Sequence, residues 1–250
     1  MIREERLSNI LDILSKERFA SVEELSHRLF VSPPTIRRDL SELTRRHAVI
    51  RSHGGAIPVP ENNSVIPIDF RNGQDIRGKI QLARRAAHMV RDGDVIYIDA
   101  STTTLHIVDY IRDLTNIIVI TNSIQVALLL RKYNITGYCT GGVLIDNSMA
   151  FAGSFAEATV SNFNIDIMFF STMAVNPNGY IADYSEMEAH LRKVALKNAR
   201  RSVYLADRSK FEKSSVFHIA HLNEMDQIIT NAPLPKYSCE ISAEVLIVKE

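Results

Sequence analysis

The sequence is poor in cysteine and has no long apolar run. Only two cysteines, Cys139 and Cys239, occur in 250 residues, and they belong to no paired motif. This excludes a disulfide framework and a cysteine-based zinc site, and it favours a reducing compartment. The most apolar stretch, 163–175, is interrupted by Asn164 and Asp166, whereas a bilayer span needs about 20 consecutive apolar residues. The N-terminus has no apolar signal core either, so we expect a cytoplasmic protein that makes no membrane contact.

The chain also lacks a net charge, since 29 lysines and arginines balance 29 aspartates and glutamates. A zero sum gives no general sign of nucleic-acid binding, but local clusters of charge decide that question. The hydrophobic share of 46% and the charged share of 23% are those of an ordinary globular protein. A chain of this length can hold one large domain, or a small domain followed by a medium one.

Residues 1–58 carry the pattern of three short helices followed by two short strands. Apolar residues recur in the first helix at the spacing of one buried face. Ser21 and Glu24 have the spacing of a capping box at the start of the second helix. Ser32 can cap the third helix, which has a proline at its first position. We therefore expect a small, mainly helical domain here.

The rest of the chain differs from the first 58 residues in composition and in its pattern of apolar residues. Residues 59–75 are rich in proline and asparagine and are predicted to be a linker. From residue 76 to residue 250, β-type runs alternate with helical patterns, and this alternation predicts a mostly parallel sheet covered by helices, in an α/β domain. The predicted strands are 95–98, 117–120, 167–170, 203–205 and 228–229.

The third helix of the small domain has an apolar and a polar face. Ile36, Leu40 and Leu43 must point into the core, which turns toward solvent the side chains of Pro34, Thr35, Arg37, Arg38 and Ser41. In a helix–turn–helix, the first residues of the second helix reach base edges, and the fork of arginine matches guanine. The alternative is a three-helix protein-interaction module whose arginines are merely solvated.

A glycine turn follows this helix and suits a wing. A tight turn at Ser52-His53-Gly54-Gly55 lets backbone amides approach DNA phosphates. The candidate DNA-contacting residues are therefore Ser32, Pro34, Thr35, Arg37, Arg38, Ser41, Arg51, His53 and Gly54.

Four consecutive hydroxyls follow the first strand of the larger region. The strand ends at Asp99, and after Ala100 a helix opens on Ser101, Thr102, Thr103 and Thr104. The amides and the dipole at a helix N-terminus favour an anion, and ligands of parallel sheets bind at the carboxyl ends of strands. In the alternative, purely structural interpretation, one hydroxyl caps the helix and the others face water, but a single hydroxyl would suffice for capping. We therefore predict a phosphate site.

Two later loops also carry candidate ligand-binding residues directly after a strand. Asn122 and Ser123 follow the next strand and again open a helix. Gly141 and Gly142 follow a probable strand at 137–140, and glycine permits close approach of the backbone to a ligand. Ordinary turns use the same residues, so each loop alone is weak evidence for a site.

The small domain resembles the DNA-binding head of DeoR-type regulators. The similarity rests on the stretch 31–40, which contains TIRRDL, and on 51–56, which contains HGGA. It implies a winged helix–turn–helix domain at 1–58 that binds double-stranded operator DNA. It further implies, beyond a linker, a sensor domain at 76–250 similar to the sugar-phosphate isomerase and CoA-transferase fold. The family consists of oligomeric regulators, and we expect a repressor of sugar-metabolism genes controlled by a phosphorylated sugar or a related small phosphate.

The resemblance also assigns roles within the sensor domain. Lys79 would be the basic residue near the phosphate, and 101–104 would be its cradle. Asn122 and Ser123 would lie beside the sugar. Three further residues fall at family positions, namely Glu188, Asp207 and Lys210.

The chain departs from the family pattern at several sensor positions. Ser101 stands where the family usually has glycine, and Arg192 stands where lysine is frequent. The stretch 170–174 replaces a common FxGxxG-type sequence. These departures bear on the identity of the sugar more than on the phosphate.

An isomerase-like enzyme that carries a nucleic-acid-binding head is the main alternative. An isomerase needs a carboxylate base, for which Glu188 and Asp166 are candidates. The chain has no G-x-S-x-G, Walker or H-E-x-x-H motif, and His218 and His221 lack an evident third metal ligand. We therefore expect no enzyme activity, no metal and no cofactor. A third possibility is a DNA-binding protein whose second domain is only an oligomerisation scaffold.

We also expect at least a homodimer. Two heads must contact successive half-sites about 34–36 Å apart along DNA. A linker restrained by proline limits the freedom of the heads but cannot set their spacing, so the larger domains must do so.

Overall fold

The computed structural model describes residues 2–17, 19–45, 48–52, 54–58, 68–72, 75–237 and 240–248. The chain divides into two compact units, Met1–Ser64 and Val65–Glu250, which we call the head and the sensor unit. Each unit is described by itself below.

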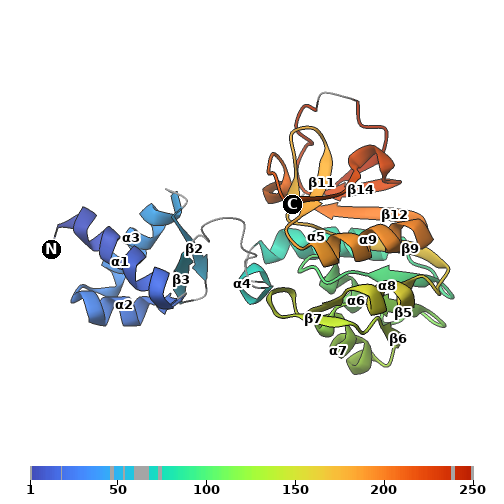
Figure 1. Cartoon of the computed structure of the whole chain (residues 1–250), viewed down its shortest axis with the longest axis horizontal. Coiled ribbons are helices and arrows are strands. Elements are labelled where there is room, and N and C mark those ends of the chain that lie inside the picture. The colour runs from blue at the N-terminus through green and yellow to red at the C-terminus, as the bar shows by residue number, and fades with distance from the viewer. Residues whose placement is uncertain are drawn as a thin grey trace. The chain divides into compact units, whose positions relative to one another are not determined.

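The head consists of three helices and a small antiparallel sheet. Its elements are α1 (Arg3–Glu17), β1 (Ala20–Ser21), α2 (Val22–Leu29), α3 (Pro33–Arg45), β2 (Val49–Ser52) and β3 (Gly55–Pro58) (Figure 1). The strand order is β1-β3-β2, and both pairings are antiparallel. The three predicted helices and both predicted strands are present, whereas the two-residue strand β1 was not predicted.

Local signals in the sequence explain these boundaries. The Ser21 hydroxyl accepts the Glu24 N–H at 3.1 Å, and the Glu24 carboxylate accepts the Ser21 N–H at 2.8 Å, so the predicted capping box starts α2. Gly55 pairs with Ser21 across the sheet, and a Cβ on Gly55 would lie 2.3 Å from the Ala20 carbonyl oxygen. The second glycine of the turn is therefore required by strand pairing.

One acidic residue of α3 points inward. Asp39 is only 1% exposed, and its carboxylate accepts hydrogen bonds from Nε and Nη2 of Arg6 on α1. The apolar core of the head contains Ile10 of α1 and Leu40 of α3, each close along its helix to one residue of this ion pair. Asp39 thus fastens α3 to α1, and its charge is withdrawn from the solvent face of α3.

The sensor unit is built around one parallel sheet. Its strands are β4 (Val95–Ile98), β5 (Ile118–Thr121), β6 (Thr136–Cys139), β9 (Ile165–Phe170), β12 (Ala199–Ala206), β14 (Gln227–Thr230) and β15 (Glu244–Ile247). The order is β15-β14-β12-β9-β4-β5-β6, and every pairing in it is parallel. The prediction of a mostly parallel sheet is confirmed.

Helices cover both faces of this sheet, and strand residues alternate between the two cores. The helices are α4 (Ile68–Asn72), α5 (Ile76–Ala87), α6 (Val108–Ile111), α7 (Ile124–Tyr133), α8 (Ser154–Val160) and α9 (Glu186–Asn198). Tyr97 and Phe170 pack with apolar residues of α8 and α9. Ile98 and Phe169 pack with those of α5, α6 and α7.

Smaller elements complete the unit. A second sheet has the order β10-β11-β13, and β7 pairs with β8. The bounds are β7 (Val143–Ile145), β8 (Ala150–Ala152), β10 (Ala174–Val175), β11 (Tyr180–Asp183) and β13 (Phe217–His221), with 3-10 turns η1 (Thr104–Ile107), η2 (Asp146–Ser148), η3 (Arg208–Lys210) and η4 (Leu222–Glu224).

The strand order reverses between β4 and β9. From β4 the chain continues outward to β5 and β6, whereas from β9 it continues outward to β12, β14 and β15. The loops that leave the carboxyl ends of β4 and β9 therefore diverge, and such a reversal opens the crevice in which parallel α/β proteins bind ligands.

Two boundaries differ from expectation. Within the predicted linker 59–75, residues 68–72 form α4, whose Ile68 is 2% exposed, and the Asp75 side chain caps α5 by accepting the Gly78 N–H. Residues 59–67 lie outside the described residues. The helix expected to open at residue 101 begins instead as the 3-10 turn η1 at Thr104.

We predict that Asp39→Asn destabilises the head. The change leaves Arg6 without its buried carboxylate, and hydrogen bonds to charged groups contribute about 1.5–3 kcal/mol each. Hydrogen exchange in the full-length protein should show α3 amides opening at a free energy lower by about 2 kcal/mol. Asp12→Asn is the matched control in the same unit, because Asp12 is an exposed residue of α1 and exposed charges contribute at most about 1 kcal/mol. Equal protection in the parent and in Asp39→Asn would contradict this role.

Candidate functional site

The solvent face of α3 is the first candidate site. Arg37, Arg38 and Ser41 are exposed, whereas Ile36, Leu40 and Leu43 on the opposite face are buried. The division of the helix into an inner and an outer face is as predicted. Arg37, Arg38 and Ser41 border a shallow open depression together with Glu42 and Arg45.

The charges around α3 leave the start of the helix positive. Arg45 forms an ion pair with Glu42, with Nη2 and Oε1 2.7 Å apart, whereas Arg37 only approaches Glu23, at 4.0 Å. Arg38 makes no ion pair or hydrogen bond within the described part of the chain. Because Asp39 is turned inward, no carboxylate of α3 itself opposes Arg37 and Arg38 in the first two turns.

The structure brings several of the predicted DNA-contacting residues close together. Ser32 precedes α3, and its hydroxyl lies 3.0 Å from that of Thr35. The side chain of Arg51 on β2 reaches the Arg37 carbonyl, with a hydrogen bond of 3.2 Å, so strand and helix adjoin. Pro34 is exposed, and so is Gly54 at the β2–β3 turn. His53 lies outside the described residues.

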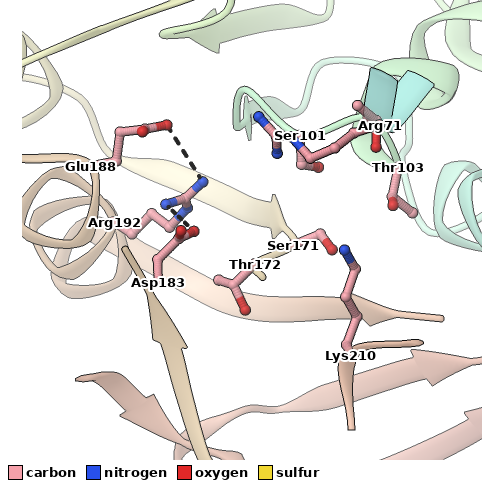
Figure 2. Close-up of a pocket in the computed structure, with 10 residues that line it drawn as sticks. Arg71, Ser101, Thr103, Ser171, Thr172, Asp183, Glu188, Arg192 and Lys210 are labelled. Carbon is pink, nitrogen blue, oxygen red and sulfur yellow. Dashed lines mark hydrogen bonds and ion pairs between the residues drawn. The ribbon is translucent and has the colours of Figure 1, made fainter. Parts of the chain in front are cut away.

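The second candidate site lies where β4 and β9 end. Ser101, Thr102 and Thr103 follow β4, and Ser171 and Thr172 follow β9 at the same edge of the sheet. All five line one cavity, and Figure 2 shows Ser101, Thr103, Ser171 and Thr172 around it. The cavity is lined further by Arg71 of α4, Asp183 of β11, Glu188 and Arg192 of α9, and Lys210 of η3. We call it the inner pocket.

Arg192 is held by three carboxylates. Its Nε donates to Asp99 at 3.0 Å. Its Nη1 donates to Asp183 at 3.1 Å, and its Nη2 lies 3.9 Å from Glu188 (Figure 2). Although burial alone would lower the pKa of Arg192, the three carboxylates raise it. Burial raises the pKa of Glu188, against the opposing charge of Arg192. The cluster is an internal ion network rather than a free anion receptor.

A wider basic pocket adjoins the inner one. Arg71, Thr102 and Lys210 line both, and the wider pocket, which we call the outer pocket, is completed by Asp75, Lys79, Met173, Asp207, Arg208, Ser209 and Lys213. The Lys79 ammonium donates to the Arg71 carbonyl. Burial and the charge of Lys210 lower the pKa of Lys79 to about 8, and burial lowers the pKa of Lys210 although Asp207 opposes this. Burial therefore makes it less favourable for these two lysines to be charged, and a bound anion would favour their charged forms again.

The predicted effector residues divide into two groups. Seven of them line one or both pockets, namely Lys79, Ser101, Thr102, Thr103, Glu188, Asp207 and Lys210. Asp99 lines neither pocket but adjoins a lining residue, since its buried carboxylate accepts hydrogen bonds from Arg192 and from Thr104.

The remaining five predicted residues also line neither pocket. The Thr104 hydroxyl is occupied by Asp99, and the Ser123 hydroxyl caps α7. Asn122 bonds to the Tyr97 hydroxyl and the Phe151 carbonyl. Gly141 and Gly142 both have positive φ, and a Cβ on Gly142 would lie 2.5 Å from the Ala152 carbonyl oxygen. The structure thus gives each of these residues a local structural role.

Five residues of the inner pocket were missed from the site prediction. Ser171 and Thr172 follow a predicted strand, so the rule that identified Ser101 could have found them. Arg71 fell in the predicted linker, and Asp183 ends a strand, β11, that was not predicted. Arg192 was noted only as a departure from the family pattern.

The arrangement does not favour the proposed catalytic bases. Asp166 stands at the start of β9, where its carboxylate accepts the Val95 N–H at 3.0 Å, at the opposite edge of the sheet from the pocket. Glu188 faces the Arg192 network. Within the described residues, no three His, Cys, Asp or Glu side chains gather so as to hold a metal ion.

The head has three helices, one of which exposes arginines, and a β-hairpin. It is joined in the chain to a parallel α/β unit with a polar pocket. This combination is that of a DNA-binding regulator. Residues 6–61 match the DeoR-like helix-turn-helix domain, and residues 74–232 match the DeoR C terminal sensor domain. The chain therefore belongs to the DeoR family of transcription regulators, which is a family of DNA-binding proteins rather than enzymes.

Individual relatives agree with this assignment. The chain is 34% identical to the HTH-type transcriptional regulator YulB of Bacillus subtilis over 94% of its own length and 91% of the relative's. It is 26% identical to the glycerol-3-phosphate regulon repressor of Escherichia coli over 94% and 93%. Ribose 5-phosphate isomerase A of Methanocaldococcus jannaschii is a distant structural neighbour, at 24% identity and a TM-score of 0.40 over 54% of each chain. Among the helices that the structure describes, none has the length and apolar character needed to cross a membrane.

We predict that Lys79 titrates near pH 8. Since its pKa is lowered in the folded protein from 10.5 to about 8, the folded state releases this proton before the unfolded chain does. The free energy of unfolding should therefore rise with pH between about 8 and 10.5. NMR of 13C-labelled lysines should show a resonance with this midpoint that is missing from Lys79→Arg, and the variant should lose this part of the pH dependence. A Lys79 resonance that titrates only above pH 10 would contradict the burial argument.

Proposed function

We propose that this chain is a cytoplasmic repressor of sugar-metabolism genes, at least a homodimer, whose affinity for operator DNA is set by a phosphorylated sugar or a related small phosphate. The observation that carries the regulatory half is the gathering of hydroxyls and half-buried cations at the strand-order reversal. Ser101, Thr102 and Thr103 offer donors, and Arg71 and Lys210 offer charge, at the edge of the sheet where ligands of this architecture bind.

The head supports the operator half of the proposal. The outer face of α3 presents Arg37 and Arg38 near the N-terminal end of the second helix of a helix–turn–helix, where side chains reach the major groove. Arginine pairs bidentately with guanine. Arg51 and the turn at Gly54 lie on the adjoining hairpin, where they suit contacts with phosphates that fix orientation.

We predict that Arg38→Ala weakens operator binding by about 1–3 kcal/mol and relaxes preference at one base pair. The operator is obtained by selecting duplexes from a random pool with the parent protein, and affinities are measured by fluorescence anisotropy at fixed salt. Arg37→Ala is tested alongside. A phosphate-contacting arginine should instead weaken all sequences alike and reduce the salt dependence. Arg112→Ala, an exposed arginine of the sensor unit, is the control. Parent-like binding by both head variants would exclude this docking of α3.

We predict that a phosphorylated sugar, and not its unphosphorylated form, raises the melting temperature, because a ligand that binds only the folded state stabilises it. A thermal-shift panel of sugar phosphates identifies the effector. Thr102→Ala and Lys210→Met should each reduce the shift, whereas Lys132→Ala, at an exposed position of α7, should not. An unchanged shift in the Thr102→Ala, Lys210→Met double variant would place the pocket elsewhere.

The same ligand separates the rival functions. An effector that changes operator affinity, by about 5–150-fold for a typical allosteric coupling, and is recovered unaltered supports a sensor. Turnover that disappears in Glu188→Gln would support the isomerase-like enzyme. The absence of any effect of bound ligand on operator affinity would leave the sensor unit as a scaffold.

A further inference from the structure

The strand β6 leaves one edge of the parallel sheet open. Among the described strands it pairs with β5 alone (Figure 1), and all four of its residues are exposed. The Thr140 N–H donates to the Thr121 carbonyl of β5 at 3.0 Å. Because successive residues of a strand direct their backbone groups to opposite sides, the N–H and C=O groups of Gly137 and Cys139 point away from β5. This edge therefore presents backbone donors and acceptors to the outside.

The sequence around β6 has none of the usual protection of a sheet edge. Proteins commonly prevent strands from adding to an edge by placing a charged side chain or a proline there, or by covering the edge. The sequence from residue 133 to residue 145 contains no charged residue and no proline. By contrast β15, the strand at the opposite edge, begins with Glu244. Of the two edges, that of β6 is therefore the one suited to receive another strand.

The surroundings of β6 favour a second copy of this chain as the partner. Tyr138 is 48% exposed, and its ring lies 5.1 Å from that of Phe163, between centroids. A two-fold axis places the same surface on both sides of an interface. An uncharged strand meets no like charge when it pairs with its own copy, and aromatic residues that face each other across two strands stabilise the pair. The edge is thus complementary to itself.

We propose that β6 joins two copies of this chain, by antiparallel pairing of the two edge strands about a two-fold axis at Tyr138. In this register Gly137 of each copy pairs with Cys139 of the other, and their outward N–H and C=O groups bond to each other. The two seven-stranded sheets become one continuous sheet. This inference rests on the proposed function, since it names the surface that forms the homodimer proposed there.

Disulfide trapping in the full-length protein tests the register. Tyr138→Cys is combined with Cys139→Ser and Cys239→Ser, so that each chain carries one thiol. Directly opposed residues at a non-hydrogen-bonded position have Cα atoms about 4.5 Å apart, which a disulfide can span. Mild oxidation should therefore link most chains into covalent dimers on a non-reducing gel. Ile247→Cys on β15, in the same background, is the matched control, because Ile247 is 49% exposed, and its chains should stay unlinked.

Cys139→Pro tests the backbone pairing. The change removes an outward N–H and leaves the hydrogen bonds to β5, and proline is accepted in edge strands at such positions. Sedimentation equilibrium should show the dissociation constant between copies raised by at least about tenfold. Ile247→Pro is the matched control and should associate like the parent. The Val248 N–H donates to the Thr230 carbonyl, so the Ile247 N–H also points outward. Thermal unfolding first establishes that both variants fold.

The outcomes separate this inference from the proposed function. If the parent is a monomer at every concentration, the proposed homodimer fails, and this inference fails with it. If the parent is assembled but Tyr138→Cys forms no disulfide, the inference alone is overturned, and the homodimer uses another surface. A folded Cys139→Pro that associates as tightly as the parent overturns it as well. If Cys139→Pro does not fold, the disulfide experiment decides.

Discussion

The Asp99 carboxylate is the contact on which the sensor unit depends. It lies just beyond β4, accepts hydrogen bonds from Arg192 of α9 and from Thr104 of the following turn, and lies 3.4 Å from the Ser171 amide beyond β9. One buried group therefore ties together the two strand ends that diverge at the reversal of strand order. The hydroxyls of both loops are held around the cavity because their loops share this anchor.

Such an anchor is not the most stable way to fill a protein interior. Burying charges removes them from water, and an apolar cluster of similar volume often gives equal or greater stability. The sensor unit nevertheless buries Arg192 with three carboxylates, and burial lowers the pKa of Lys79 and of Lys210 in the outer pocket. A polar interior of this kind sits at functional sites in many proteins, where recognition of a charged ligand offsets its cost.

Periodic features were predictable from the sequence, and contacts between distant segments were not. The parallel sheet, the outer face of α3 and the hydroxyls at 101–103 follow from alternation, helical spacing and the rule for strand ends. Asp39 has a helical position that says nothing about Arg6, 33 residues away. Asp183 reaches the pocket through β11, whose pairing with β13 joins segments far apart in the chain. Arg71 lay among prolines and asparagines whose composition indicated a linker.

The place of Arg71 in the chain determines where a fragment that contains the complete ligand site must begin. Arg71 lies on α4, ahead of the first long helix of the unit, and it lines both pockets. Its backbone carbonyl also receives the Lys79 ammonium. A fragment begun at residue 76 would keep all seven strands of the parallel sheet and still lack part of the cavity wall. A binding-competent fragment has to begin before Ile68, so the boundary of the folded core and the boundary of the ligand site are different positions in the chain.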